Sequence, residues 1–466
     1  MKTSLVGDEP STTLAPERPG VAPQHTTGRW IHGWDPEDTI LWRNGGRRIA
    51  RRNLSISIYA EFLGFCVWAL WSVVVPRLPA AGIEVTVSQQ FWLVSLPALV
   101  GATLRIPYSF AVTKVGGRNW TAISSLLLLV PALALSWGIA TQQSYEVLLA
   151  CAALAGFGGG NFASSMTNIS FFYPEAEKGK ALGLNAAGGN LGTGVVQMIV
   201  PLVVTVGAGL HLARAGLMFI PLALIAALLA WLLMDNLDSA RSDLSAYTGA
   251  LRVRHTWLIS FLYLGTFGSF VGYSAAFPTL LKSQFPEKSA YLAFAGAIIG
   301  ALLRPLGGII SDRIGGARMT IASYAVMAVG AVLAITALRH HNFALFLLAF
   351  FTMFAGSGLG NGATYRMIPA IFRLRANAAS LPTARRLAGA CIGIAGAIRA
   401  GRLVATRTRS GVIPAAAAIN AAGDGLGRDR GLSRLLPESG PEIGRGGAPA
   451  CLSGAGCGWC VPDPCS

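Results

Sequence analysis

The sequence predicts an all-α polytopic membrane protein, and three observations lead to this fold class. Of its 466 residues, 53% are hydrophobic and only 12% are charged, whereas a soluble domain carries about 25% charged residues. Apolar stretches of about 20 residues, long enough to cross a bilayer, recur along the chain. Basic residues gather in the polar segments between them, which is typical of the cytoplasmic loops of membrane proteins.

The apolar stretches number ten. They are predicted over residues 54–75, 90–112, 119–140, 146–172, 181–206, 214–234, 257–281, 290–310, 318–338 and 343–372. Basic residues follow every second span, and five more precede the first, among them Arg47, Arg48, Arg51 and Arg52. This bias predicts a multi-pass protein of the inner (plasma) membrane whose N-terminus is cytoplasmic.

The longest polar segment between spans, residues 235–256, separates the first six spans from the last four. This division is typical of a transporter made of two packed halves. We expect the following parts in order: a cytoplasmic N-terminal tail (1–52, disordered over 1–29), a six-helix bundle (53–234), a cytoplasmic linker (235–256), an incomplete second bundle (257–398) and an anomalous tail (399–466).

The anomalous tail departs from the pattern of the rest. Residues 399–466 are rich in Arg, Gly, Ala, Pro and Cys and contain no further apolar stretch of about 20 residues. This bias is typical of a GC-rich gene read out of frame, so we expect a frameshift near codon 399.

Cys457 and Cys460 lack the second pair of ligands that a zinc site needs. We therefore expect no metal and no cofactor, and no nucleic-acid partner, because the net charge of +16 lies in loops and tails.

Two arginines lie inside apolar spans at matching places of the two halves. Arg105 occurs in LVGATLRIPYSF and Arg304 in IIGALLRPLGG, each close to a proline. A guanidinium in a bilayer span costs about 3 kcal/mol or more, so both should face a cavity near the midplane, where transporters bind substrate. Their planar, permanently charged, forked donors suit a planar oxyanion. The alternatives are that each arginine reaches a helix end or pairs with a structural acid.

Residues 156–194 contain small residues and amides where helix backbones must approach closely. The stretch GFGGGNFASSMTNISFFYPEAEKGKALGLNAAGGNLGTG resembles the nitrate/nitrite porter (NarK-like) branch of the major facilitator superfamily, whose members carry GxNFASSMxNISFFxP. The resemblance implies the two-bundle major facilitator fold, normally of twelve transmembrane helices, here with ten clear helices and a disrupted C-terminal end. It implies transport of nitrate and nitrite by alternating access, with no enzymatic activity.

The same resemblance assigns roles to side chains. It implies that Arg105 and Arg304 clamp the anion and that the rings of Phe162 and Phe267 sandwich it. Tyr263, one turn before Phe267, matches a tyrosine whose hydroxyl reaches the substrate region. Asn190 in AGGNLG can add a neutral hydrogen-bond donor.

A loop pattern occurs twice, as YSFAVTKVGGRNW after the second span and as GGIISDRIGGARM after the eighth. The second copy resembles the corresponding major facilitator loop, and its Asp312, Arg313 and Arg318 are predicted to form a gating latch on the cytoplasmic side. The alternative is a solvated turn.

Glu61 in IYAEFLGFCVW is the acid of the first span. A carboxylate within the membrane can carry protons, which predicts proton–nitrate symport. Alternatively, Glu61 pairs with an arginine or is solvated, and the chain exchanges nitrate for nitrite. A carrier of another small anion, or an inactive truncated porter, is the other functional reading. We expect a monomer in the lipid bilayer.

Overall fold

The computed structural model describes residues 24–207, 209–240, 244–373, Leu387 and Cys391. The strands are β1 (Gln24–Thr26), β2 (Trp30–His32) and β3 (Asn236–Leu237). The helices are α1 (Thr39–Leu41), α2 (Arg47–Val74), α3 (Val87–Val115), α4 (Gly117–Leu127), α5 (Leu129–Ala140), α6 (Tyr145–Leu154), α7 (Gly156–Phe172), α8 (Glu175–Thr205), α9 (Arg214–Leu217), α10 (Phe219–Leu233), α11 (Leu244–Arg252), α12 (Arg254–Gln284), α13 (Ala293–Ile314), α14 (Gly316–Arg339) and α15 (Phe343–Arg373). Short turns of 3-10 or π helix complete the list: η1 (Thr27–Arg29), η2 (Trp42–Gly46), η3 (Val75–Arg77), η4 (Pro79–Ala81) and η5 (Ala290–Leu292).

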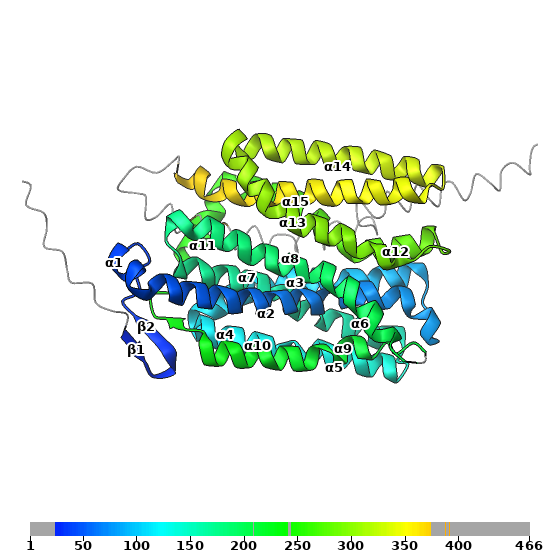
Figure 1. Cartoon of the computed structure of the whole chain (residues 1–466), viewed down its shortest axis with the longest axis horizontal. Coiled ribbons are helices and arrows are strands. Elements are labelled where there is room, and N and C mark those ends of the chain that lie inside the picture. Colours follow the sequence, from blue (N-terminus) through cyan, green and yellow to red (C-terminus); the bar gives the residue numbers. More distant parts are fainter. Residues whose placement is uncertain (1–23, 208, 241–243, 374–386, 388–390, 392–466) are drawn as a thin grey trace, which may run out of the picture. The chain divides into compact units, whose positions relative to one another are not determined.

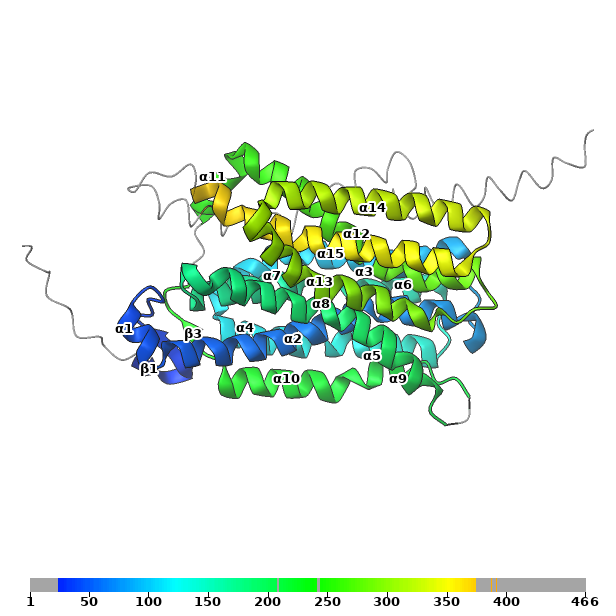
Figure 2. The same cartoon turned by 45° about the horizontal axis from the view of Figure 1, so that its top comes forward.

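Ten helical segments of the described chain are long and apolar enough to cross a membrane, which confirms the predicted number. Three of them are pairs of helices that continue one another: α4 with α5, α6 with α7, and α9 with α10. Figures 1 and 2 show these helices running alongside one another. The predicted frame change near codon 399 and the tail over 399–466 lie outside the described residues.

We call α2–α10 the first half and α12–α15 the second half. Across the two, α13 packs against α8, and α12 packs against α2 and α3. Within the second half, α14 and α15 pack side by side, as both views show. We call the end of the bundle where α2 begins and α10 ends the linker end, because the link from α10 to α12 leaves from it.

Two glycines give the repeated loop the same backbone in both halves. Gly116, between α3 and α4, has φ 94° and ψ 146°, and Gly315, between α13 and α14, has φ 91° and ψ 136°. A side chain would clash in this region, so glycine is needed at both positions. The matching turns make α3 and α13 corresponding helices, and these are the helices that carry Arg105 and Arg304.

Glycines also allow helix backbones to touch. A Cβ at Gly158 of α7 would lie 2.1 Å from the carbonyl oxygen of Gly64 in α2, and one at Gly358 of α15 would lie 2.2 Å from that of Gly300 in α13. Such distances are impossible for any larger residue. The glycine-rich runs of the sequence are therefore packing surfaces, in keeping with the role of small residues between membrane helices.

The expectation of a disordered segment over residues 1–29 is wrong for its last six residues. β1 pairs antiparallel with β2, and β2 pairs parallel with β3, with Trp30 opposite Asn236 and Ile31 opposite Leu237. The hairpin thus joins the segment that follows α10. Ile31 is fully buried, which anchors the hairpin at the linker end.

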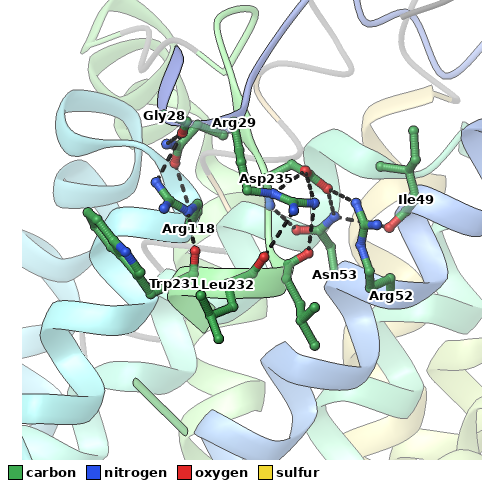
Figure 3. Close-up of polar contacts among 11 residues, drawn as sticks. Gly28, Arg29, Ile49, Arg52, Asn53, Arg118, Trp231, Leu232 and Asp235 are labelled. Atoms are coloured by element: carbon green, nitrogen blue, oxygen red, sulfur yellow. Dashed lines mark hydrogen bonds and ion pairs between the residues drawn. The ribbon is translucent and has the colours of Figure 1, made fainter. Parts of the chain in front are cut away.

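Asp235 is the centre of the polar network beside this hairpin (Figure 3). Its buried carboxylate accepts hydrogen bonds from Arg29 at 2.8 Å, Arg52 at 2.6 Å and Asn53 at 2.8 Å. Arg118 extends the network by donating to the carbonyl oxygens of Gly28 at 3.0 Å and of Trp231 at 2.7 Å. The network ties the N-terminal segment to α2, α4 and α10.

Candidate functional site

Arg105 of α3 and Arg304 of α13 converge from the two halves. Their exposed fractions are 0% and 3%. The guanidinium carbon of Arg105 lies 4.7 Å and 4.9 Å from the ring centres of Phe162 and Phe267, and that of Arg304 lies 5.6 Å and 5.7 Å from the same two rings. Both guanidiniums therefore lie beside the same pair of rings. These distances are short enough for a cation and an aromatic ring to attract each other.

The aromatic pair also spans the two halves. Phe162 of α7 and Phe267 of α12 are stacked, with ring centres 5.5 Å apart, and Tyr263 is also stacked on Phe267, with ring centres 5.1 Å apart. All three rings are at most 2% exposed. A centre distance of 5.5 Å is that of rings in contact. An anion held between Phe162 and Phe267 thus requires the two rings, and with them α7 and α12, to move apart.

Several polar groups at the centre of the bundle are buried without a hydrogen-bond partner among the described residues. They include both terminal nitrogens of Arg304 and both amide atoms of Asn190. Leaving a buried donor unpaired costs about 1–3 kcal/mol, and more when the group is charged. Such groups are therefore suited to a polar ligand, and the excess positive charge specifies an anion.

Sequence reasoning missed three side chains in this region. Trp68 of α2 lies 5.8 Å from the Arg105 guanidinium carbon and donates to the carbonyl oxygen of Pro97 at 2.7 Å. Tyr365 of α15 lies 5.4 Å from the Arg304 guanidinium carbon. Asn361, one turn before Tyr365, is fully buried with both amide atoms unpaired in the described structure. Polar residues spaced four apart in the apolar run GSGLGNGATY were the available signal.

A family model described as "Major Facilitator Superfamily" matches residues 61–419. The chain is 43% identical over 363 residues to "Nitrate/nitrite transporter NarU" of Salmonella typhimurium, with 74% of this chain and 79% of that protein covered. The chain belongs to the nitrate/nitrite porter branch of the major facilitator superfamily. This porter is also 36% identical over 376 residues to "Probable nitrate/nitrite antiporter NarK2" of Thermus thermophilus, covering 74% and 83% of the two chains.

Solved structures support the fold of this porter. It matches a crystal structure of the D-xylose–proton symporter with a TM-score of 0.58, covering 77% of this chain and 89% of that chain. A partially occluded, inward-open structure of the Escherichia coli xylose transporter XylE matches with a TM-score of 0.57, covering 84% of this chain and all of the other. The identities are 17% and 13%, so these likenesses concern the fold alone.

Glu61 of the porter is fully buried, so the solvated alternative is wrong. Its carboxylate accepts hydrogen bonds from Ser165 of α7 and from Asn185 of α8, the latter at 2.7 Å. Ser165 continues to Ser57 at 3.0 Å. These described partners all belong to the first half, and no ion pair to Arg105 or Arg304 occurs among the described contacts.

Asp312 and Arg313 lie on the last turn of α13 and Arg318 on the first turn of α14, and all three are exposed. Asp312 pairs with Arg366 of α15 at 2.6 Å, whereas Arg313 and Arg318 take part in none of the described ion pairs. Arg366 also lies against α8 of the first half, because a Cβ at Gly179 would be 2.3 Å from its terminal nitrogen. The contact of Asp312 is therefore with α15, which the sequence did not indicate, and its role as a gating latch stays a prediction.

At the end away from the linker, Gln197 of α8 joins the two halves. Its side-chain nitrogen donates to the carbonyl oxygen of Ser274 in α12 at 2.6 Å and to the hydroxyl of Ser72 in α2 at 3.1 Å. A pocket of about 20 Å³ is lined in part by Trp68, Ser72 and Ser274, the last two being the partners of Gln197. That volume suits about one water molecule.

Proposed function

We propose that this chain transports nitrate and nitrite across a membrane by alternating access, with Arg105 and Arg304 as the anion clamp. The observation that carries the proposal is the convergence of the two buried guanidiniums, one from each half, on the pair Phe162 and Phe267. The two nitrate/nitrite relatives named above support the choice of anion.

The geometry suits a small planar oxyanion for electrostatic reasons. Each guanidinium presents parallel N–H donors in one plane, which match the oxygen pairs of nitrate or nitrite. The aromatic rings exclude water, and the lower local dielectric strengthens the attraction between charges. A tetrahedral oxyanion is not planar and cannot lie flat between two rings. The stacked state of Phe162 and Phe267 then corresponds to a site that must open to admit substrate.

Exchange of one anion for another follows from the charge of the clamp. Two buried like charges are costly to enclose together unless a counter-charge lies between them. The halves therefore close readily only around an anion, which favours nitrate/nitrite antiport. The second candidate is proton–nitrate symport, and the specific observation in its favour is the fully buried carboxyl of Glu61 within hydrogen-bond reach of Ser165 and Asn185.

We also propose that the linker end of the bundle lies on the cytoplasmic side of a bacterial plasma membrane. Arg47, Arg48, Arg51 and Arg52 lie on the first turns of α2 at this end, and basic residues favour the cytoplasmic side. A reporter active only in the periplasm, fused after Leu233 or after Gly207, tests this orientation. We expect activity at Gly207 only.

The deciding experiment is nitrate uptake into cells that lack their own porters. The chain is compared with Arg304→Lys and Arg105→Lys, which keep the charge but lose the forked geometry. We expect uptake by the unmodified chain and a loss of about tenfold or more in each variant, since a bidentate contact to a charged group contributes about 1.5–3 kcal/mol. Uptake of another small anion in place of nitrate, or equal uptake by the lysine variants, would overturn the proposal.

A further inference from the structure

Tyr365 occupies the linker-end side of the clamp. Its ring centre lies 5.3 Å from that of Tyr263 and 6.4 Å from that of Phe162, and 5.4 Å from the guanidinium carbon of Arg304. The next residue, Arg366, pairs with Asp312 close to the linker end of α13. The same turn of α15 thus carries the Tyr365 ring, which lies in the site, and the Arg366 guanidinium, which lies at the exposed linker end.

The packing of α15 on α13 fixes this ring. A Cβ at Gly362 would lie 2.0 Å from the carbonyl oxygen of Arg304, so the two backbones touch at the residue that carries the clamp. Tyr365 follows Gly362 by three positions, which places it on a neighbouring part of the same helix surface. The position of the tyrosine relative to Arg304 is therefore set by backbone contact and not by a flexible side chain.

The hydroxyl of Tyr365 is buried and has no hydrogen-bond partner among the described residues. Both terminal nitrogens of Arg304 are also buried and have no hydrogen-bond partner among the described residues. A buried hydroxyl left unpaired costs about 1–3 kcal/mol. A phenol beside a cation is a good hydrogen-bond donor to an anion. Because the phenol is neutral, it adds no further positive charge that would prevent release of the anion.

We propose that the Tyr365 hydroxyl is a substrate-binding donor, which hydrogen-bonds the oxyanion held by Arg304 and thereby raises the affinity of the second half for it. The inference rests on the proposed function and deepens it. It adds a neutral donor from α15 to the one that Asn190 of α8 offers from the first half, so each half would hold the anion with one arginine and at least one neutral group.

The test is the Tyr365→Phe variant, which keeps the ring against Phe162, Tyr263 and Arg304 and removes the hydroxyl alone. Nitrate binding to the purified chain in detergent is measured by calorimetry, and nitrate uptake gives KM and the maximal rate. We expect the dissociation constant and KM to rise about tenfold, the usual loss for a hydrogen bond to a charged group, with an unchanged melting temperature.

Tyr108→Phe is the matched control. The Tyr108 hydroxyl is also buried and unpaired in the described structure, but its ring packs on Trp120 at 4.9 Å and on Gly160. We expect its nitrate affinity to equal that of the unmodified chain. If both variants lose affinity alike, or if Tyr365→Phe changes only the maximal rate, the donor role is wrong. If the unmodified chain itself binds no nitrate, the proposed function fails instead.

Discussion

Gln197 and Ser274 join the two halves of the molecule directly, through a hydrogen bond of 2.6 Å from the side-chain nitrogen of one to the carbonyl oxygen of the other. Gln197 is 3% exposed. A second bond, to Ser72, links the same amide to α2. Alternating access requires the halves to separate at this end when the site opens toward it, so the bond to Ser274 must break in every cycle, whereas the bond to Ser72 lies within the first half.

Gln197→Leu should therefore favour opening at the end away from the linker. The change keeps the approximate volume of the side chain and removes two hydrogen bonds, of which the one to Ser274 joins the two halves and contributes about 1 kcal/mol. We expect the ratio of closed to open molecules to fall about fivefold. The measurement is the distance between spin labels at positions 202 of α8 and 283 of α12, with the tail cysteines changed to serine.

Ser72→Ala serves as the control for that experiment, because it removes the 3.1 Å bond and leaves the bond to Ser274. We expect a smaller shift than in Gln197→Leu. Identical distance distributions in all three proteins would contradict a closing role for Gln197.

Glu61→Gln separates exchange from proton coupling. We expect nitrate/nitrite counterflow in vesicles to persist, because Ser165 and Asn185 can hydrogen-bond an amide as well as a carboxylate. Without the negative charge of Glu61, less of the positive charge of Arg105 and Arg304 is neutralised. Nitrate should therefore bind more tightly. Vesicles with and without a pH gradient provide the measurement. Gradient-driven uptake that is present in the unmodified chain and lost in Glu61→Gln would establish symport and refute exchange as the native mode.

The sequence identified Arg105 and Arg304 because a charge inside an apolar span is conspicuous: its cost demands a reason. It could not single out Trp68, since aromatic residues in such spans usually serve packing alone, and it pointed to Tyr365 only through the spacing of that residue from Asn361. The partners of Glu61 lie on α7 and α8, about 100 and 120 positions away, and emerge only when those helices assemble. Local sequence carries no trace of such contacts.

The hairpin formed by β1 and β2 was missed for a related reason. Its sequence is short and polar, which is typical of a disordered tail. What orders it is β3, more than 200 positions away, together with the pairing of Arg29 and Asp235. The ten spans, in contrast, could be counted from sequence because each needs only its own apolar residues and internal hydrogen bonds.

Asp235→Ala should destabilise the linker end. The carboxylate is fully buried, whereas the Arg29 and Arg52 side chains are 33% and 37% exposed. Removing one member of a buried charge network costs about 3–5 kcal/mol, and partial exposure of the arginines favours the lower value. A lower melting temperature in detergent is the expected result. Asp238→Ala, which breaks only the exposed contact to His32, should leave the melting temperature unchanged.

Gly362→Ala tests whether backbone contact between α13 and α15 positions the clamp. The added Cβ would meet the carbonyl oxygen of Arg304 at 2.0 Å and the amide nitrogen of Gly308 at 2.8 Å, and neither backbone atom can move without its helix. The helices must separate, which displaces Arg304 and Tyr365 together. We expect nitrate affinity to fall by at least about tenfold, with a lower melting temperature.

Gly308→Ala, on the facing helix, is the control for this prediction. A Cβ there meets only the carbonyl oxygen of Gly362, at 3.9 Å, which is an ordinary contact. Alanine also reduces the conformational freedom of the unfolded chain, so stability should hold or rise slightly. If Gly308→Ala impairs binding as much as Gly362→Ala does, small residues at this interface serve flexibility in general. If Gly362→Ala alone impairs it, the anion clamp depends on how closely α15 approaches the backbone of Arg304.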